Sequence, residues 1–312
     1  MSSGGTIRLG LIGAGRWGRN YISTIARLDG VELAYLVSHN PASRDLVDAG
    51  CRISDSWRDP IEAGDLDGLI VATGPAIQGE IAIAAMGAGL PLMLEKPVTT
   101  DVASTQRLLD LSMSVGVPVL VDHVYLFSAA FAALKQEIPH LGGLRSLRAS
   151  RGSWGPFRAN LRALWDWAPH DLAMCIDLAG TAPERIEGRM LKDERMIEGD
   201  GETIRLDLAF SSGIATEITI GNLMKPPKRL FTAVCQNGEM IFDDLADDKL
   251  VCLSNAGRIA IPLVDDPPLS RAVDVFARGI GGGDLSAFGL DLAVDVARVI
   301  AEVERQLEPK DA

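Results

Sequence analysis

The sequence has few cysteines, and their spacing matches no metal site and no disulfide framework. The four lie far apart along the chain and form no C-x-x-C pair: Cys51, Cys175, Cys235 and Cys252. Structural zinc sites and disulfide-dense secreted domains both need cysteines at short, regular spacings. We therefore expect no metal and no disulfide framework, which fits a protein of the reducing cytoplasm.

Positive charge is also scarce. The chain carries 30 Lys and Arg against 42 Asp and Glu, a formal net charge of -12. Such a surface repels the phosphate backbone of nucleic acids and the headgroups of an anionic bilayer. We therefore expect neither a nucleic acid nor a membrane as a partner.

A long apolar segment is missing as well. Residues 81–94 are uncharged, but the stretch is shorter than the roughly 20 residues of a membrane-spanning helix. It is also interrupted by Gly87, Gly89 and Pro91. The first residues, MSSGGTIR, lack the apolar core of a secretory signal. Both features indicate a cytoplasmic protein.

The 312 residues are long enough for two domains, at about 150 residues per domain. In the first part, short, continuously apolar runs alternate with amphipathic segments, which is typical of parallel strands buried under crossover helices. The predicted strands are 7–12, 31–37, 69–72, 92–94 and 117–121, and the predicted helices are 19–28, 78–88 and 100–114. Residues 1–122 are therefore predicted to form an α/β domain.

In the second part the apolar residues alternate strictly with polar ones. Apolar side chains occupy every second position over 204–210, and the alternation resumes over 214–220 after Ser211-Ser212-Gly213. This pattern predicts an antiparallel hairpin with one buried face. Further strands are expected near 231–235, 240–242, 250–253 and 259–263, with a closing helix at about 290–307. Residues 123–312 are therefore predicted to form an α+β domain on a large, mostly antiparallel open sheet.

A glycine motif, Gly13-Ala14-Gly15-Arg16-Trp17-Gly18, directly follows the first predicted strand and opens a helix. In this context Gly13 allows the tight turn, Gly15 lets the backbone approach a pyrophosphate, and Gly18 lets the helix pack on the strand. The positive end of the helix attracts the anion. The motif predicts a Rossmann dinucleotide-binding domain, the alternative being a turn that binds nothing.

The end of the second predicted strand bears on the choice of cofactor. An NAD-specific domain usually has Asp or Glu there, about 20 residues past the glycine motif, to bind the adenosine ribose. This chain has Ser38, followed by His39 and Asn40. With no carboxylate to repel it, a 2′-phosphate could be bound by Ser38, the following amides and Arg44. The residues favour NADP, unless Ser38 only ends a strand and specificity is loose.

Two further motifs contain candidate catalytic residues. Glu95-Lys96-Pro97 follows the fourth predicted strand, at the sheet edge where open α/β folds bind ligands. A lysine there can stabilise a substrate oxygen that becomes anionic as a hydride leaves. The alternative is a solvated pair of charges on the surface.

The second of these motifs is the segment WDWAPHD, residues 165–171. If a helix begins at about Asp166, with Pro169 in its first turn, Asp166 and His170 face the same way. A histidine oriented by a carboxylate suits a general base near neutral pH. The alternative is a helix N-cap with a satisfied neighbour. The other histidines are expected to be structural, with His39 bordering the cofactor.

Taken together, these motifs resemble the Gfo/Idh/MocA family, the glucose-fructose oxidoreductase and inositol dehydrogenase group. The motifs are GAGRWG, EKP, VDHVYLFSAAFAALK after the fifth strand and the D-x-x-x-H of WDWAPHD. The resemblance extends over nearly the whole chain. It implies a nicotinamide dinucleotide on the Rossmann domain and a sugar or cyclic polyol over the open face of the second sheet. Relatives pair through that sheet, so it also implies a homodimer or homotetramer.

The resemblance further implies roles for individual residues. Lys96 matches a lysine that contacts substrate and cofactor, and Asp166 and His170 match the catalytic pair. Two positions depart from the family pattern: Gln78, where members often carry histidine, and Ser38, where Asp is commoner. The predicted dinucleotide contacts are Gly13, Gly15, Arg16, Trp17, Gly18, Ser38, His39, Arg44, Thr73, Glu95 and Lys96.

One local feature suggests the chemistry of the substrate. Five arginines, at 145, 148, 151, 158 and 162, are interleaved with Trp154, Phe157, Trp165 and Trp167. Arginine forks suit phosphate or carboxylate groups, and aromatic faces suit sugar rings. The predicted substrate contacts are Arg151, Trp154, Arg158 and Trp165, for an anionic sugar such as a nucleotide-linked sugar. The alternative is arginines on a solvent-facing strand and aromatics packed at a domain junction.

The sequence thus predicts an NAD(P)-dependent oxidoreductase that acts on CH–OH groups of a sugar, a cyclic polyol or a nucleotide-linked sugar. Two alternatives keep the same motifs. One is a ligand sensor with this fold and no turnover, and the other is an NAD-assisted lyase or glycosidase in which oxidation is transient. Net consumption of cofactor separates a dehydrogenase from both.

Overall fold

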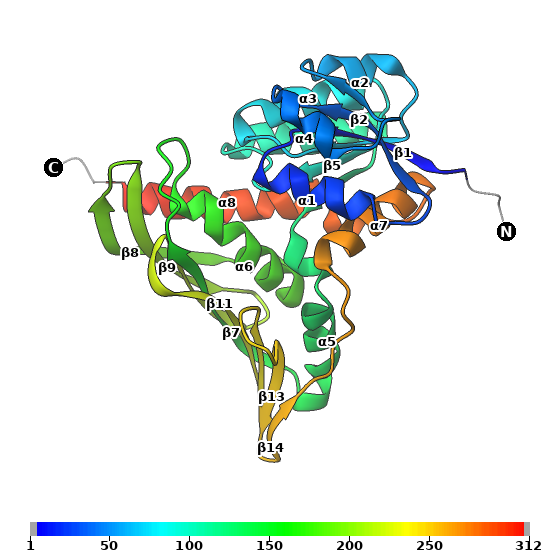
Figure 1. Ribbon diagram of the computed structural model, residues 1–312. Helices are drawn as coiled ribbons and strands as arrows, with labels where there is room; N and C mark the ends of the chain where they lie inside the picture. Colours follow the sequence, from blue (N-terminus) through cyan, green and yellow to red (C-terminus); the bar gives the residue numbers. More distant parts are fainter. Residues whose placement is uncertain (1–4, 309–312) are drawn as a thin grey trace. The chain divides into compact units, whose positions relative to one another are not determined.

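The computed structural model describes residues 5–308, which form two compact units (Figure 1). Unit 1 comprises the described residues up to Val124 together with Pro267–Val294. Unit 2 comprises Tyr125–Asp266 together with the described residues from Asp295 onward. Helix α8 (Leu290–Leu307) therefore contributes its first residues to unit 1 and the remainder to unit 2.

Unit 1 is built on sheet A, in which six strands run in the order β3-β2-β1-β4-β5-β6 and every pairing is parallel. The strands are β1 (Ile7–Ile12), β2 (Val31–Val37), β3 (Arg52–Ser54), β4 (Gly68–Val71), β5 (Leu92–Glu95) and β6 (Val119–Asp122). Five were predicted, whereas β3 was missed because Arg-Ile-Ser offers no apolar run. The strand order reverses between β1 and β4, which is where such sheets bind ligands.

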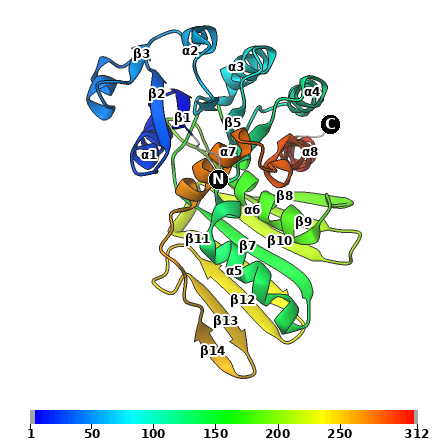
Figure 2. The same cartoon turned by 90° about the vertical axis from the view of Figure 1, so that its right-hand side faces the viewer.

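Helices cover both faces of sheet A. They are α1 (Arg16–Ile25), α2 (Arg58–Ala63), α3 (Pro75–Gly87), α4 (Val102–Val115) and α7 (Pro268–Ile280). Figure 2 shows α3 and α4 on one side of the strands and α1 on the other. Helix α4 begins where the Asp101 carboxylate accepts the Ser104 N–H, and it ends at Gly116 in the left-handed conformation.

The assignment of α7 to unit 1 differs from the domain boundary expected from the sequence. We placed everything after residue 122 in the second domain, but Pro267–Val294 clusters with unit 1. The physical reason is the close packing of α7 on β4. A Cβ atom at Gly68 would lie within 3.0 Å of both Ile280 and Phe276. The amphipathic pattern of α7 did not reveal which sheet its apolar face covers.

Unit 2 is built on sheet B, in the order β14-β13-β12-β11-β7-β10-β9-β8. Its strands are β7 (Leu144–Trp154), β8 (Arg185–Arg195), β9 (Asp200–Ala209), β10 (Ala215–Gly221), β11 (Leu223–Cys235), β12 (Gly238–Asp243), β13 (Leu250–Ser254) and β14 (Gly257–Ala260). All pairings are antiparallel except that of β7 with β10. The predicted mostly antiparallel sheet is confirmed.

The two faces of sheet B differ in polarity. In the β9–β10 hairpin, Leu206 pairs with Ile218, and both are fully buried. On the other face, Arg205 pairs with Thr219 and Asp207 pairs with Glu217. Helices α5 (Ala129–Glu137) and α6 (Ala163–Ala179) lie against one side of the sheet (Figure 2). The apolar face is therefore the helix-covered face, and the charged face is open.

Helix α6 begins earlier than the sequence suggested. It starts at Ala163, so Pro169 lies inside the helix rather than in its first turn. Glu202 on β9 explains the early start, because its carboxylate accepts the backbone N–H of Ala163 and a hydrogen bond from Arg162. This cap comes from a strand that is distant in the sequence, so no local sequence pattern could predict it.

Two expectations from the sequence concern the state of the cysteines and the presence of a membrane-spanning helix. All four cysteines are free thiols, and three of them are buried. No helix within residues 5–308 is long and apolar enough to cross a membrane.

Candidate functional site

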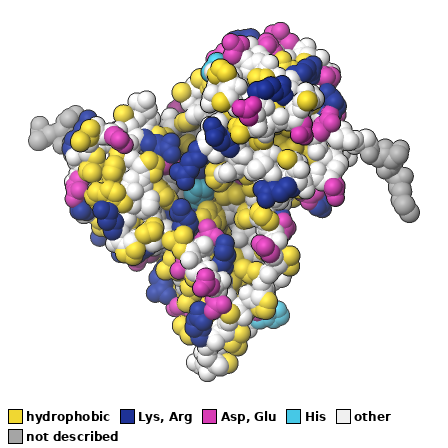
Figure 3. Space-filling view, in the orientation of Figure 1, with side chains coloured by type: hydrophobic (Ala, Val, Ile, Leu, Met, Phe, Trp, Pro, Cys, Tyr) yellow, Lys and Arg dark blue, Asp and Glu magenta, His cyan; other side chains and the backbone are white. Residues whose placement is uncertain are grey.

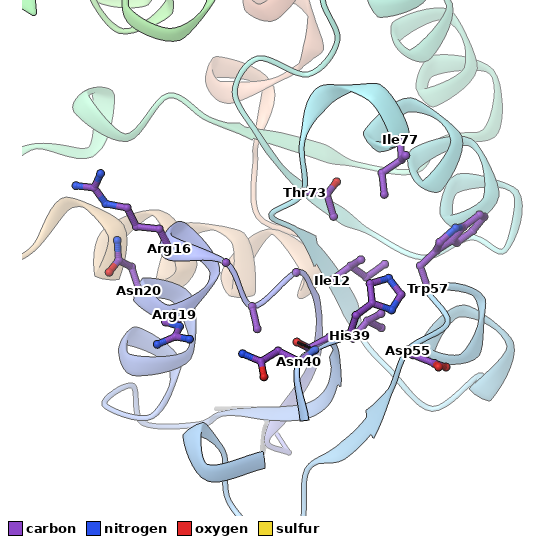
Figure 4. A pocket seen from close by; sticks show the side chains of 15 residues that line it. Ile12, Arg16, Arg19, Asn20, His39, Asn40, Asp55, Trp57, Thr73 and Ile77 are labelled. Carbon is purple, nitrogen blue, oxygen red and sulfur yellow. Dashed lines mark hydrogen bonds between the residues drawn. The ribbon is translucent and has the colours of Figure 1, made fainter. Parts of the chain in front are cut away.

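Unit 1 contains a cavity of about 800 Å³ at the switch point of sheet A. Figure 4 shows its walls: α1 on one side, the segment after β3 on the other, and the turn after β2 between them. The lining residues are Ile12, Gly13, Ala14, Gly15, Arg16, Arg19, Asn20, Val37, Ser38, His39, Asn40, Asp55, Trp57, Thr73 and Ile77. The cavity is therefore formed at the carboxyl ends of β1, β2 and β4.

The glycine turn is shaped so that the cavity stays open beside the helix N-terminus. Gly13 has a positive φ of 103°, and a Cβ atom there would lie 2.5 Å from the Ala72 carbonyl oxygen. At Gly18 a Cβ atom would lie 1.9 Å from the Gly13 carbonyl oxygen. At Gly15, by contrast, it would enter open space. The N-terminus of α1 has no side-chain cap and no acid in its first turn. These features fit a bound pyrophosphate.

The turn after β2 presents hydroxyl and amide groups where many NAD-binding folds present a carboxylate. Ser38 Oγ lies 2.8 Å from Ser43 Oγ and accepts a hydrogen bond from the Asn40 N–H. Arg44 is not part of the cavity wall, because its guanidinium donates to the carbonyl oxygens of Asp48 and Cys51. Arg19 lines the cavity instead.

The structure brings together six of the predicted dinucleotide contacts: Gly13, Gly15, Arg16, Ser38, His39 and Thr73. Trp17, Gly18, Arg44, Glu95 and Lys96 lie outside the cavity lining. Sequence reasoning missed Arg19, Asn20, Asp55, Trp57 and Ile77. Arg19 and Asn20 stand one turn past Arg16 on α1, a spacing that could have revealed them. Asp55 and Trp57 follow β3, the strand that was not predicted.

The loop that carries Lys96 is held by Gln78, one of the two departures from the family pattern. Gln78 is fully buried on α3, and its Nε2 donates to the carbonyl oxygens of Glu95, Pro97 and Val98 at 2.7, 3.0 and 3.1 Å. The bond between Lys96 and Pro97 is cis. Gln78 thus fixes the backbone on both sides of Lys96.

Two buried acids lie beside Lys96 at the ends of β5 and β6. Glu95 and Asp122 are register partners, and the Tyr21 hydroxyl lies 2.8 Å from Glu95 Oε1 and 2.5 Å from Asp122 Oδ2. A phenol has one proton, so it donates to only one carboxylate; the other contact is a hydrogen bond only if that acid is protonated. We infer that the cluster retains a proton.

The pKa values of this cluster point the same way. Burial raises the pKa of Asp122 to about 6, against opposing hydrogen bonds from Tyr21 and Glu95. Burial, and then repulsion by Asp122, raises the pKa of Glu95 well above its usual value. Burial together with the positive charge of Lys96 lowers the pKa of His123 to about 3. His123 is therefore neutral at physiological pH.

In unit 2, α6 carries the predicted catalytic pair. Asp166 and His170 are four residues apart on one face of the helix, and Asp166 Oδ2 lies 3.3 Å from the Nε of Arg158. The ring of His170 makes an edge-to-face contact with Tyr125, with centroids 5.2 Å apart. Tyr125 was not predicted as a site residue, although it lies within VDHVYLFSAAFAALK, the motif after the fifth predicted strand, which is β6 in the structure.

A buried ion pair lies under Tyr125. Arg151 is 1% exposed, and its Nε and Nη2 each donate to Asp171 at 2.9 Å. The Arg151 guanidinium lies 4.0 Å from the centroid of the Tyr125 ring. Tyr125 donates its hydroxyl to Asp244 at 3.0 Å. These contacts fix the tyrosine that packs on His170.

The pKa values of both members of this ion pair are raised, but for different reasons. Burial disfavours the charge on Arg151, but attraction to Asp171 outweighs that cost and raises the pKa of Arg151. Burial also raises the pKa of Asp171, against the opposing pull of Arg151. Two parallel charge-assisted hydrogen bonds favour the ionised pair. We therefore describe both groups as charged.

The structure separates the four predicted substrate contacts into two kinds. Trp154 and Arg158 are exposed, with Lys225 Nζ lying 3.7 Å from the centroid of the Trp154 ring. Arg151 and Trp165 are buried. The remaining arginines of the cluster bond to side chains within unit 2: Arg145 to Gln236, Arg148 to Glu239 and Arg162 to Glu202.

A family model described as "Oxidoreductase family, NAD-binding Rossmann fold" matches residues 7–123. The crystal structure of a protein from Magnetospirillum magnetotacticum MS-1, assigned to the oxidoreductases, matches with a TM-score of 0.90. That protein is 35% identical, over 95% of this chain and 98% of its own. The chain belongs to the Gfo/Idh/MocA oxidoreductase family.

Two curated relatives of this Gfo/Idh/MocA protein have names that state an activity. The 4-carboxy-2-hydroxymuconate-6-semialdehyde dehydrogenase of Sphingobium sp. (strain NBRC 103272 / SYK-6) is 24% identical over 97% of this chain and 99% of its own. Inositol 2-dehydrogenase 4 of Saccharopolyspora erythraea is 29% identical over 44% of this chain and 42% of its own. The predicted family and fold class are confirmed, and the protein is an oxidoreductase with an NAD-binding Rossmann fold.

Proposed function

We propose that this protein transfers a hydride between the nicotinamide of NAD(P) and a hydroxyl-bearing carbon of a sugar, a cyclic polyol or a nucleotide-linked sugar. The cavity of unit 1 carries the proposal, because its glycine turn and uncapped helix suit the pyrophosphate of a dinucleotide. A bound nicotinamide supplies the hydride acceptor. The dehydrogenase names of two relatives support this chemistry.

Three side chains are proposed to act on the substrate. His170 removes the hydroxyl proton on oxidation and returns it on reduction, in the orientation that Tyr125 packing gives its ring. Asp166, one turn earlier on α6, stabilises the imidazolium that results. Lys96 donates to the substrate oxygen and stabilises its developing negative charge.

The turnover test uses reduced-nicotinamide absorbance with NAD or NADP and a panel of polyols, sugars, sugar acids and nucleotide sugars. We expect one substrate class to reduce the cofactor and His170→Ala to lower kcat/KM by about a hundredfold or more. His140→Ala, at an exposed histidine in a short 3-10 helix, is the matched control and should keep full activity. Tight cofactor binding with no net reduction would instead support a sensor or a transient oxidation.

For the cofactor we propose NADP over NAD. Ser38 and Arg19 both line the cavity, so a 2′-phosphate would meet a hydroxyl and a guanidinium rather than a carboxylate at the end of β2. Ser38→Asp should therefore lower kcat/KM for NADP by about tenfold or more relative to NAD. An unchanged ratio of the two cofactors in this variant would contradict the proposal.

We further propose that the protein forms a homodimer or homotetramer through the open face of sheet B, with the substrate on the helix-covered side of unit 2, where His170 lies on α6, and not over the open face that the resemblance implied. The mixture of Arg205, Asp207 and Glu217 on this face allows complementary contacts between two copies. Light scattering after gel filtration measures the mass directly. A monomer at micromolar concentration would overturn this proposal.

A further inference from the structure

Arg229, on β11, differs from most of the cations around it. In a chain with an excess of acids, charges of both signs are interspersed over the visible face (Figure 3), and most arginines of sheet B contact a carboxylate. Arg229 is half-buried, yet no carboxylate within residues 5–308 lies at ion-pair distance from it. A half-buried guanidinium that no carboxylate neutralises is available to bind an anionic ligand.

The register of sheet B places Arg229 beside the residues around His170. Arg229 pairs directly with Arg151 of β7, so the two side chains lie on the same, helix-covered face. Arg151 is already committed to Asp171. Asp244, whose backbone N–H donates to the Arg229 carbonyl, directs its carboxylate to Tyr125 and Lys249. The neighbouring acids are thus occupied by other partners.

A second unsatisfied donor lies next to Arg229. The guanidinium is 5.6 Å from the centroid of the Trp167 ring. The indole Nε1 of Trp167 is buried, and it has no acceptor among the described residues. Trp167 precedes His170 by three residues on α6, so both side chains lie on one side of the helix. Within the described residues, a guanidinium with no carboxylate partner and an indole N–H with no acceptor therefore lie close together, and the indole is one helical turn from the proposed general base.

We infer that Arg229 and the Trp167 Nε1 form a subsite for an anionic oxygen group of the substrate, a carboxylate or a phosphate. The planar guanidinium can offer two parallel N–H groups to such an anion, and the indole N–H supplies a third donor. A neutral sugar could accept these hydrogen bonds through its hydroxyl oxygens, but it would bring no negative charge to the guanidinium. The inference rests on the proposed function for the reacting end of the substrate, and it adds the class of substrate to it.

The test compares neutral and anionic members of matched pairs: glucose against glucuronate, and glucose against glucose 6-phosphate. Binding to the NADP-loaded protein is measured by calorimetry, and KM is measured wherever turnover occurs. We expect one anionic probe to bind about tenfold to a hundredfold more tightly than glucose, the range typical of charged hydrogen bonds. The glucuronate and phosphate arms show which anion the subsite prefers.

Three variants assign that preference to the subsite. Arg229→Met should remove the advantage of the anionic probe over glucose. Arg229→Lys should retain part of this advantage, because the positive charge remains while the two parallel N–H groups of the guanidinium are lost. Trp167→Phe should weaken the advantage, because the aromatic ring remains but the indole N–H is lost. Lys228→Met is the control: it removes the adjacent, exposed cation of β11, which pairs with Gly152 rather than Arg151.

The outcomes separate this inference from the proposed function. Anion selectivity that is lost in Arg229→Met supports the subsite even if no probe is turned over. Turnover of neutral polyols with no preference for anions would contradict the proposed subsite, while it would still support the proposed dehydrogenase activity. A preference for anions that Lys228→Met abolishes as strongly as Arg229→Met would also overturn it, because the effect would then be general electrostatics.

Discussion

The two units bury charged side chains in opposite ways. In unit 1, Glu95 and Asp122 are acids of like charge, both held against the hydroxyl of Tyr21. In unit 2, Arg151 and Asp171 are opposite charges joined by two hydrogen bonds. All four side chains are at most 8% exposed, so burial alone does not distinguish the clusters.

The difference lies in how each cluster responds to protons. Two adjacent acids cannot both ionise cheaply in a dry interior, so the unit 1 cluster retains a proton: the pKa of Asp122 is raised to about 6, and the pKa of Glu95 is raised well above its usual value. The ion pair of unit 2 compensates its own charge and gains nothing from protonation. We therefore expect the first cluster to depend on pH and the second to depend on both partners being present.

The largest effect is expected from breaking the ion pair. Arg151→Met leaves the Asp171 carboxylate buried without its partner, and such a loss costs about 3 to 5 kcal/mol in the free energy of unfolding. Chemical denaturation measures it. Arg148→Met, on the same strand, breaks a surface pair with Glu239 and should cost no more than about 1 kcal/mol. Equal losses in the two variants would contradict this account of Arg151.

A smaller, pH-dependent effect is expected at Asp122. Its pKa in the folded protein is about 6, above the ordinary value of 3.8, so the folded state binds more protons between these values. The contribution of Asp122 to stability is therefore present below about pH 4 and is lost as pH rises towards 6, by at most about 1.4 kcal/mol per pH unit.

The variant Asp122→Asn isolates this contribution, because the amide oxygen can still accept from Tyr21 but cannot titrate. The unfolding free energy of the variant, minus that of the wild type, should rise between about pH 4 and 6 and then level off. Denaturation curves at several pH values measure the difference. Asp29→Asn, an exposed position, should give a flat difference. A flat difference for Asp122→Asn as well would show that the acids do not share a proton.

The smallest effect is expected from removing the hydroxyl that joins the two acids. Tyr21→Phe keeps the packing of a fully buried ring and deletes its hydrogen bonds, which should cost about 1 to 2 kcal/mol. The midpoint of denaturation reports the loss. Tyr35→Phe is a matched control, since Tyr35 stacks against Arg52 through its ring rather than its hydroxyl. If both variants were equally stable, the hydroxyl of Tyr21 would have no role in the cluster.

The parts of the fold that local patterns encode could be predicted from the sequence. Strands buried on both faces are continuous apolar runs, so β1 and β2 were predicted with their observed bounds. The strict alternation of the β9–β10 hairpin predicted which face is buried. Short or charged strands such as β3 and β8 carry neither signal, since pairing with neighbours decides them.

In the candidate site, too, local patterns predicted some residues, and others are brought together only by the fold. The glycine turn depends on residues within one short segment, so Gly13, Gly15 and Arg16 were predicted to line the cofactor cavity. The approach of Arg229 to Trp167 depends on strand register and helix packing across unit 2, which no spacing in the sequence reveals. The same holds for Tyr21, Glu95 and Asp122, which meet from three different elements.

The division of α8 between the two units has a consequence for the order of folding during synthesis. Unit 1 lacks α7 until residues 267–294 have been made, and unit 2 lacks its last helical segment until the residues after Asp295 follow. Neither unit therefore has all of its parts until these late segments have been made. Chains that stop before Leu290 would leave both units unfinished, so neither unit can complete its folding before α8 has been made.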